Sequence, residues 1–362
     1  MKSPIFLHIG QGKTGTSAIQ AALARNHDAL KARGLLYPEH GSFAQARAGQ
    51  VTSGNLDPEN WFEGQVMPAV RAAPGHPAYL FSNEHLLYRM DEFFERVARY
   101  RDDYRFEIIL FVRNPIESLA STYQQAVKRG GYAGSIRAFA EHEAVTPLAA
   151  SAVERLDRAG IAFTLFNYSV TLGDTVARFF GHLGMAELVA AQRAAEIVNR
   201  SLSRAELEFV RYVNQIFGAH HGTLVADALV NELPDVAAER VEIDQATRDY
   251  VRARNGEAMD LLNRFLPASE RLTFDMADDP AGATPHSELS TAQSAVIARM
   301  FPGVLTPADG IVLRDIAMKY DDGAALTRED AITLMEYARK ARPTGQIIAG
   351  ALKRWRDGRD AG

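Results

Sequence analysis

The chain has 362 residues, of which 47% are hydrophobic and 23% charged, a composition typical of a globular protein with a sizeable core. The formal net charge of −5 excludes a globally basic surface of the kind that attracts nucleic acid or strongly anionic polysaccharides, and the absence of cysteine excludes disulfides and thiolate chemistry. The amino-terminal apolar run is too short for a signal peptide, and no stretch approaches the ~18 apolar residues of a membrane span, so we expect a soluble, cytoplasmic protein.

Short apolar runs alternate with helical patterns in the first half of the chain. The pattern predicts strands at 4–10, 78–84, 106–113 and 161–168, and helices at 14–33, 114–129 and 171–183. Residues 41–77 show no clear period and are expected to form a long irregular excursion. Strands separated by helices indicate parallel βαβ units, so we predict an α/β fold, a three-layer sandwich with a central parallel sheet and a P-loop-like first βα turn.

Beyond about residue 200 the pattern is mostly helical. A serine precedes a helical pattern at 201–218, and RLTFDM at 271–276 is interpreted as one late strand. Residues 277–287 are rich in Pro, Gly and Asp, which is typical of a linker. The predicted organisation is therefore an α/β domain at 1–276 and a helical C-terminal appendage at 287–362, whose helices are a candidate partner surface.

The stretch HIGQGKTGTS, residues 8–17, joins the first predicted strand to the first predicted helix. Its glycines match the spacing of the nucleotide-triphosphate loop G-x-x-x-x-G-K-[ST], but the lysine lies inside the loop instead of after the second glycine. A strand-to-helix loop presents backbone N–H groups and the positive helix end to an anion. The loop itself supplies flexible glycines, one cation and three hydroxyls: Gly10, Gly12, Lys13, Thr14, Gly15, Thr16 and Ser17. We predict a site for a phosphate-like group, with a plain glycine turn as the alternative.

A second polar element follows the third predicted strand. Arg113 ends the strand, and Ser121 lies eight residues later in the next helix. Helical spacing puts four polar side chains on one face: Ser118, Ser121, Thr122 and Gln125. Ligands of open parallel sheets bind at the carboxyl ends of strands, and an arginine fork suits a phosphate. A surface ion pair on a solvated helix explains the same residues, but the loop at 8–17 favours a ligand with phosphates at two ends.

The two stretches together resemble the sulfotransferase family that uses 3′-phosphoadenosine 5′-phosphosulfate (PAPS). The resemblance covers roughly residues 4–275, with specific matches confined to 8–17 and 113–121. In that family a lysine inside a Gly/Thr/Ser loop binds the 5′-phosphosulfate, and GQGKTGTS looks like this loop. An Arg-x-Pro motif with a serine eight residues after the arginine binds the 3′-phosphate, and RNPIESLAS matches it with Arg113 and Ser121. The resemblance implies a bacterial-type member of the family.

The resemblance also implies a chemistry: in-line transfer of a sulfuryl group from PAPS to an acceptor hydroxyl or amine, with adenosine 3′,5′-bisphosphate as product. Lys13 would neutralise charge on the bridging oxygen, while Thr16 and Ser17 would hold the 5′-phosphate. The family needs no metal, and the strands here end in SNE and VRN, which supply no evident magnesium ligand set. The acceptor is expected to be a saccharide, a lipid or a small metabolite.

The acceptor also needs a base. Glu84 follows the second predicted strand and is the favoured candidate, His85 is the second, and a plain helix-start glutamate is the alternative for Glu84. His8, within the first strand, is expected to pack in the core. NRSLS at 199–203 resembles a weaker third element beside the nucleotide, contributed by Asn199, Arg200 and Ser201, although a helix cap at Ser201 explains the pattern equally well.

Two other functions stay open at this point: a metal-dependent P-loop kinase or NTPase, and a non-catalytic module that keeps a nucleotide site. The stretch YDDGAALTRE at 320–329 also has part of an EF-hand loop. Met318 and Tyr320 occupy loop positions that need carboxylates, so we do not predict a calcium site there.

Overall fold

The computed structural model describes residues 3–50, 52, 54–57, 59–171, 173–189, 200–237, 239–275, 288–300, 306–321, 323 and 327–357. The described residues form two compact units. The first unit is drawn from 1–123, 134–198 and 241–282, and the second from 124–133, 199–240 and 283–362. Within the described residues, 200–237 and 239–240 belong to the same unit as the C-terminal helices, and 241–275 belong to the first unit. The predicted linker at 277–287 lies outside the described residues.

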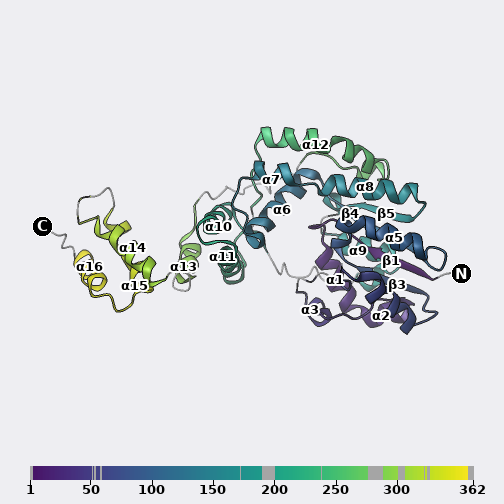
Figure 1. Cartoon of the computed structure of the whole chain (residues 1–362), viewed down its shortest axis with the longest axis horizontal. Coiled ribbons are helices and arrows are strands. Elements are labelled where there is room, and N and C mark those ends of the chain that lie inside the picture. The colour runs from purple at the N-terminus through teal and green to yellow at the C-terminus, as the bar shows by residue number, and fades with distance from the viewer. Residues whose placement is uncertain are drawn as a thin grey trace. The chain divides into compact units, whose positions relative to one another are not determined.

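The first unit contains a five-stranded parallel sheet (Figure 1). Its strands are β1 Pro4–His8, β2 Leu35–Leu36, β3 Ala78–Ser82, β4 Arg105–Val112 and β5 Ala162–Asn167. The strand order is β2-β3-β1-β4-β5, and every pair is parallel. The predicted α/β fold with a central parallel sheet and its four predicted strands are confirmed, whereas the two-residue β2 was not predicted.

Alternate side chains of the strands pack on opposite faces of the sheet, as the period of two requires. Ile108 and Leu110 of β4 belong to one hydrophobic cluster, and Ile109 and Phe111 belong to the other. The first cluster is covered by α4 Met67–Ala72, α5 Met90–Tyr100, α8 Val145–Arg158 and α12 Gln245–Asn263. The second is covered by α1 Thr16–Arg25, α2 His27–Ala32 and α9 Thr175–His182. Helices thus cover both faces of the sheet.

The other helices connect or extend this sheet, or build the second unit. They are α3 Phe43–Arg47, α6 Pro115–Gly130 and α7 Ile136–His142, then α10 Arg204–Phe217, α11 Ala219–Glu232, α13 Thr291–Met300, α14 Pro307–Met318, α15 Arg328–Ala341 and α16 Gln346–Arg356. In the second unit, α14, α15 and α16 share a core around Met335 and the buried Trp355. Asp321 belongs to the stretch 320–329 that has part of an EF-hand loop. It accepts hydrogen bonds from Trp355 Nε1 at 2.7 Å and Arg354 Nη2 at 2.8 Å. None of the helices described is both long and apolar enough to span a membrane.

Four local predictions were wrong. Residues 41–77, predicted to be irregular, contain α3, a π-helix at Phe62–Val66 and α4. The helix predicted at 14–33 is two helices, because the Asn26 side chain donates to the Ala22 carbonyl at 2.9 Å and the chain turns there. The helix predicted from 201 is capped by Ser203, whose hydroxyl accepts the Glu206 N–H in a capping box. Residues 271–275 form no strand, since the side chain of Asn263 takes both backbone hydrogen bonds of Leu272, at 2.7 and 3.1 Å.

Candidate functional site

The candidate site lies where β1 ends between β3 and β4. His8 pairs with Ser82 of β3 and Ile109 of β4, so the residues that follow these three strands meet at one edge of the sheet. Past the strand ends, the Asn83 N–H donates to the His8 carbonyl at 3.0 Å. After β1 the chain goes to β2 and β3 on one side of the sheet, and after β4 it goes to β5 on the other, so the connections diverge between β1 and β4. Such a switch point is where open α/β sheets bind ligands.

The β1–α1 loop, residues 9–15, has a constrained backbone. Lys13 has φ 66° and is the one non-glycine residue with positive φ in the described chain, and Gly15 has φ 79°. The Thr14 hydroxyl donates to the Gln11 carbonyl at 2.5 Å, which closes the turn. Gly15 precedes α1 and supplies no side-chain cap, so the first N–H groups of this helix are left for another acceptor. A strained residue in a loop that opens a helix is typical of a ligand site.

Polar atoms converge on Gly10. A Cβ placed there would lie 3.1 Å from His8 Nε2, 3.3 Å from Thr14 Oγ1 and 3.5 Å from Thr16 Oγ1. His8 Nε2 and Thr16 Oγ1 are buried and have no hydrogen-bonding partner among the described residues. An unsatisfied buried polar atom costs about 1–3 kcal/mol, so native proteins rarely leave two together without a ligand or water. The described chain thus leaves two buried polar atoms unsatisfied beside Gly10, and we call this place the cradle.

His8 is buried under the loop, as predicted, and one of its ring nitrogens is hydrogen-bonded. Its Nδ1 lies 2.9 Å from Ser82 Oγ, and Gln20 Nε2 donates to the same hydroxyl at 3.2 Å. Thr52 donates to Gln20 Oε1 at 3.2 Å. The other ring nitrogen, Nε2, lies beside Gly10 and can donate a hydrogen bond there when it carries the proton of the neutral imidazole.

Burial lowers the pKa of His8 to about 3, so the imidazole is neutral in the folded protein above that pH. Between pH 3 and 6.5 the unfolded chain binds a proton that the folded chain does not, and stability falls as the pH is lowered through this window. At pH 4.5 the loss is about 3 kcal/mol, from two pH units below 6.5 at 1.36 kcal/mol each.

Urea unfolding at pH 7.0, 5.5 and 4.5, followed by Trp61 fluorescence in a Trp355→Phe background, measures this loss. The His8→Gln variant should lack it, and His220→Gln, at an exposed histidine of α11, should keep it. Equal pH dependence in His8→Gln and the parent would contradict the buried neutral state.

Arg113 follows β4 and reaches the β1–α1 loop. Its Nη1 donates to the Lys13 carbonyl at 3.1 Å, its Nε donates to Glu117 Oε2 at 3.2 Å, and its guanidinium lies 5.1 Å from the ring centre of Tyr168. Within the described part of the chain, its Nη2 amino group has no hydrogen-bonding partner. The structure thus brings the two predicted phosphate elements together and leaves part of the guanidinium fork available.

Gln11 is a site residue that the sequence reasoning missed. It is 1% exposed, accepts the Arg113 N–H at 3.2 Å and donates to Ser118 Oγ at 2.7 Å. The residue therefore ties the loop to both the end of β4 and the start of α6. A polar residue between two loop glycines was the available signal. The Ser118 hydroxyl accepts from Gln11, and the Thr122 hydroxyl donates to the Ser118 carbonyl. Of the three hydroxyls Ser118, Ser121 and Thr122, only that of the partly exposed Ser121 stays a candidate for ligand contact.

Glu84 and His85 open the 3-10 helix Glu84–Arg89 directly after β3. The Asn83 side chain caps this helix by accepting the His85 N–H at 2.7 Å and is itself held by the Leu56 carbonyl at 2.6 Å. Glu84 is partly exposed and His85 is exposed. Both stand at the same sheet edge as the loop, and the choice between them as base stays a prediction.

Residues 54 and 55, between α3 and the π-helix, pack against the end of β3. Gly54 has φ 90°, and a Cβ there would lie 1.9 Å from the Ser82 carbonyl oxygen. Asn55 exchanges hydrogen bonds with Ser82 at 2.8 and 3.1 Å. Only glycine permits this approach, so the Gly-Asn pair was the signal that this segment packs against a strand end.

The third predicted element, NRSLS at 199–203, is not part of the candidate site. Asn199 lies outside the described residues, and Arg200 and Ser201 belong to the second unit. All five N–H donors of Arg200 are used, two by Glu206 and one each by the carbonyls of Ser201, Leu229 and Leu233. No donor of Arg200 is left for a phosphate, so we leave it out of the site. Comparison of the chain with models of known families, with curated protein sequences and with solved structures finds no match.

Proposed function

We propose that the protein transfers a sulfuryl group from PAPS to an acceptor hydroxyl or amine. The observation that carries the proposal is the contact between its two anion-type elements, in which Arg113 Nη1 donates to the Lys13 carbonyl at 3.1 Å. A loop suited to one phosphate and an arginine suited to another thus meet at the switch point of the sheet. A nucleotide with phosphates at both its 5′ and 3′ positions matches this pair.

The residues present fit such a nucleotide. The cradle beside Gly10, where Thr16 Oγ1 and His8 Nε2 would act as buried donors, suits the oxygens of a 5′-phosphosulfate. The uncapped N-terminus of α1 adds backbone N–H groups, and Ser17 a further hydroxyl. The Nη2 group of Arg113 and the hydroxyl of Ser121 would hold the 3′-phosphate. Two buried donors without protein partners are what an anion pocket of this kind requires.

The cofactor supplies an activated sulfuryl group, and the protein supplies position, charge and a base. Lys13 is exposed at the turn of the loop, where its ammonium can neutralise the charge that develops on a bridging oxygen. The loop amides and α1 hold the phosphate end still, which orients the group to be transferred. Glu84, or His85 as second candidate, takes the proton of the acceptor.

Nucleotide binding tests the proposal first. Adenosine 3′,5′-bisphosphate at about 100 times its Kd should stabilise the protein by about 2.7 kcal/mol, without added metal, and adenosine 5′-monophosphate should bind more weakly. Stabilisation by ATP that depends on Mg²⁺, and none by the bisphosphate, would instead identify a P-loop kinase or NTPase. Bisphosphate binding without sulfuryl transfer to any acceptor would identify a non-catalytic nucleotide-binding module.

Replacing Arg113 by lysine should weaken adenosine 3′,5′-bisphosphate binding about tenfold. Lysine keeps the charge but loses the planar fork that can hold the Lys13 carbonyl and a phosphate together. Calorimetric titration measures the Kd. The affinity for adenosine 5′-monophosphate, which lacks the 3′-phosphate, should fall much less.

The control is Arg105→Lys at the opposite end of β4, where the arginine is exposed. If Arg113→Lys weakened the two nucleotides equally, the assignment of Arg113 to the 3′-phosphate would be wrong.

A further inference from the structure

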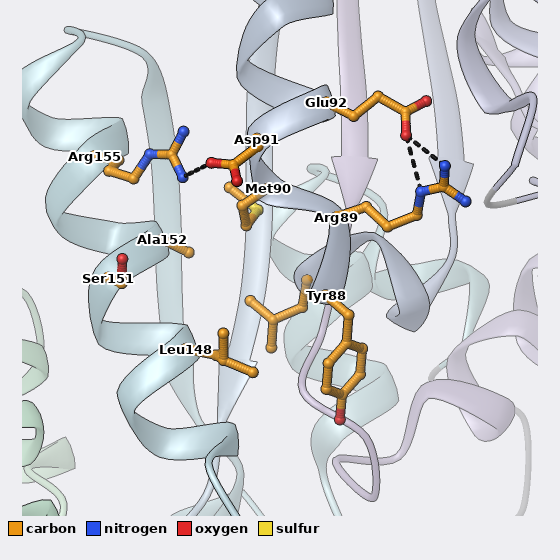
Figure 2. A pocket seen from close by; sticks show the side chains of 10 residues that line it. Tyr88, Arg89, Met90, Asp91, Glu92, Leu148, Ser151, Ala152 and Arg155 are labelled. Atoms are coloured by element: carbon orange, nitrogen blue, oxygen red, sulfur yellow. Dashed lines mark hydrogen bonds and ion pairs between the residues drawn. The ribbon is translucent and has the colours of Figure 1, made fainter.

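A pocket of about 300 Å³ lies beside the candidate base, between two segments of the first unit (Figure 2). One wall is the end of the 3-10 helix and the first turn of α5, and the other is α8. We call it the α5–α8 pocket, and it is lined by Leu87, Tyr88, Arg89, Met90, Asp91, Glu92, Leu148, Ser151, Ala152 and Arg155. The four α8 residues are spaced i, i+3, i+4 and i+7, so they form one face of that helix.

One end of the pocket reaches the edge of the sheet that holds the candidate site. Tyr88 lies six residues after Ser82, the last residue of β3, and Leu148 is in the first turn of α8, which runs back along the sheet toward β5. Figure 2 shows both side chains at the end toward which the strand arrows point. The ring centres of Tyr88 and His85 are 6.5 Å apart. Glu84 lies in the same 3-10 helix as Tyr88, four residues before it, so the candidate base and one end of the pocket belong to the same short element.

The charges of the pocket are already balanced. Arg89 pairs with Glu92 at 2.6 Å, and Arg155 pairs with Asp91 at 2.7 Å (Figure 2). Each guanidinium is thus compensated by a carboxylate of the pocket itself. The lining residues therefore carry no net positive charge to attract an anionic ligand, and a long alkyl chain would strip water from the charged groups. Uncharged hydroxyls can both donate to these carboxylates and accept from these guanidiniums.

The pocket also has an apolar side. Leu87 and Ala152 line it and are buried, and Tyr88, at one end, is 52% exposed, which leaves its ring accessible to a ligand. A sugar ring combines an apolar C–H face with hydroxyls at its edge, which matches a pocket with an aromatic ring at one end and two ion pairs toward the other (Figure 2).

We propose that the α5–α8 pocket binds the acceptor and that this acceptor is a neutral saccharide, with one hydroxyl directed past Tyr88 toward Glu84. The inference rests on the proposed sulfuryl transfer. In that step the acceptor oxygen forms a new bond to sulfur as the bond from sulfur to the bridging phosphate oxygen breaks. The hydroxyl proton passes to the Glu84 carboxylate, and the bridging electron pair leaves with adenosine 3′,5′-bisphosphate.

The test measures transfer of label from ³⁵S-PAPS to three sets of acceptors. The first contains the neutral disaccharides cellobiose, maltose, trehalose and lactose; the second contains chondroitin and heparin disaccharides; the third is dodecanol in micelles. Each is measured with the parent, with Ser151→Trp, which fills the pocket from an exposed position of α8, and with Asp157→Trp, an exposed position of the same helix outside it. Calorimetry with adenosine 3′,5′-bisphosphate is run on all three proteins.

We expect a neutral disaccharide to be the preferred acceptor and Ser151→Trp to raise its KM at least tenfold. Asp157→Trp should leave the KM unchanged, and both variants should bind the bisphosphate within twofold of the parent. Transfer only to anionic disaccharides or to dodecanol, no transfer to a neutral disaccharide despite bisphosphate binding, or equal KM values in the two tryptophan variants would overturn the pocket assignment alone. Failure of the parent to bind the bisphosphate would instead overturn the proposed function, and this inference with it.

Discussion

Replacing Lys13 by alanine should lower kcat for sulfuryl transfer by about 10²–10³-fold, the usual cost of removing a group that stabilises developing charge. The side chain is exposed, and the Lys13 carbonyl that Arg113 contacts is kept in the variant. Alanine at φ 66° carries the same strain as lysine, so the free energy of unfolding should stay within about 0.5 kcal/mol of the parent. Steady-state transfer from ³⁵S-PAPS, with urea unfolding in parallel, measures both quantities.

Glycine at the same position separates strain from chemistry. Lys13→Gly should be as inactive as Lys13→Ala but about 1 kcal/mol more stable, because glycine adopts positive φ freely and recovers more than its extra chain entropy costs. Lys31→Ala, at an exposed lysine of α2, is the control and should match the parent in both measurements. Normal kcat in Lys13→Ala would remove this lysine from the chemistry, and a large loss of stability would show that it acts through folding.

The sheet and its edge could be predicted because local signals and topology rules agreed. Apolar runs ending in glycine or in a capped helix mark four of the five strands, and parallel βαβ units bring their carboxyl ends to one edge. Asn114 illustrates this agreement, since its side chain accepts the Ile116 N–H at 2.8 Å and starts α6 directly after β4. Because the loop at 8–17 follows β1 and Arg113 follows β4, the same reasoning predicts that these two elements meet.

Side chains that replace backbone partners were not predictable. Asn263 gives Leu272 the two hydrogen bonds that a strand neighbour would have given, and Asn26 ends α1 inside an unbroken helical pattern. The two-residue β2 exists because it pairs with β3, and no window of its own sequence is long enough to show it. In each case the deciding partner is distant in sequence, or competes locally with a strong pattern.

The buried atoms of the site were also invisible in the sequence. The pattern around Lys13 predicts an anion loop, but only the structure shows that His8 Nε2 and Thr16 Oγ1 are buried together without protein partners. Conversely, the pattern at 199–203 suggested a ligand arginine, while the structure shows Arg200 fully bonded inside the second unit. Residue type and spacing cannot show that all five N–H donors of Arg200 are used, whereas the Nη2 group of Arg113 has no hydrogen-bonding partner among the described residues.

The second large prediction concerns the buried ion pair between Arg200 and Glu206. Glu206 is fully buried and accepts from Arg200 at 2.8 and 2.9 Å, from the Ser203 N–H at 2.8 Å and from Gln293 Nε2 at 2.8 Å. Burial by itself would raise the pKa of Glu206, but the hydrogen bonds from Arg200, Ser203 and Gln293 outweigh burial and hold the pKa below its usual value. The pair thus joins the start of α10 to α13, and through Arg200 to the end of α11.

Glu206→Gln should destabilise the second unit by about 3–5 kcal/mol, because the new amide turns N–H donors toward a guanidinium left buried without its counter-charge. Hydrogen exchange followed by mass spectrometry should show α10 and α11 losing that much protection, while β1, β3 and β4 of the first unit keep theirs. The matched control is Glu232→Gln, which breaks the exposed pair with Arg299 and should cost no more than about 1 kcal/mol. Equal losses in the two variants would show that Arg200 is not held by this carboxylate, and would return Arg200 to the list of residues able to bind a phosphate.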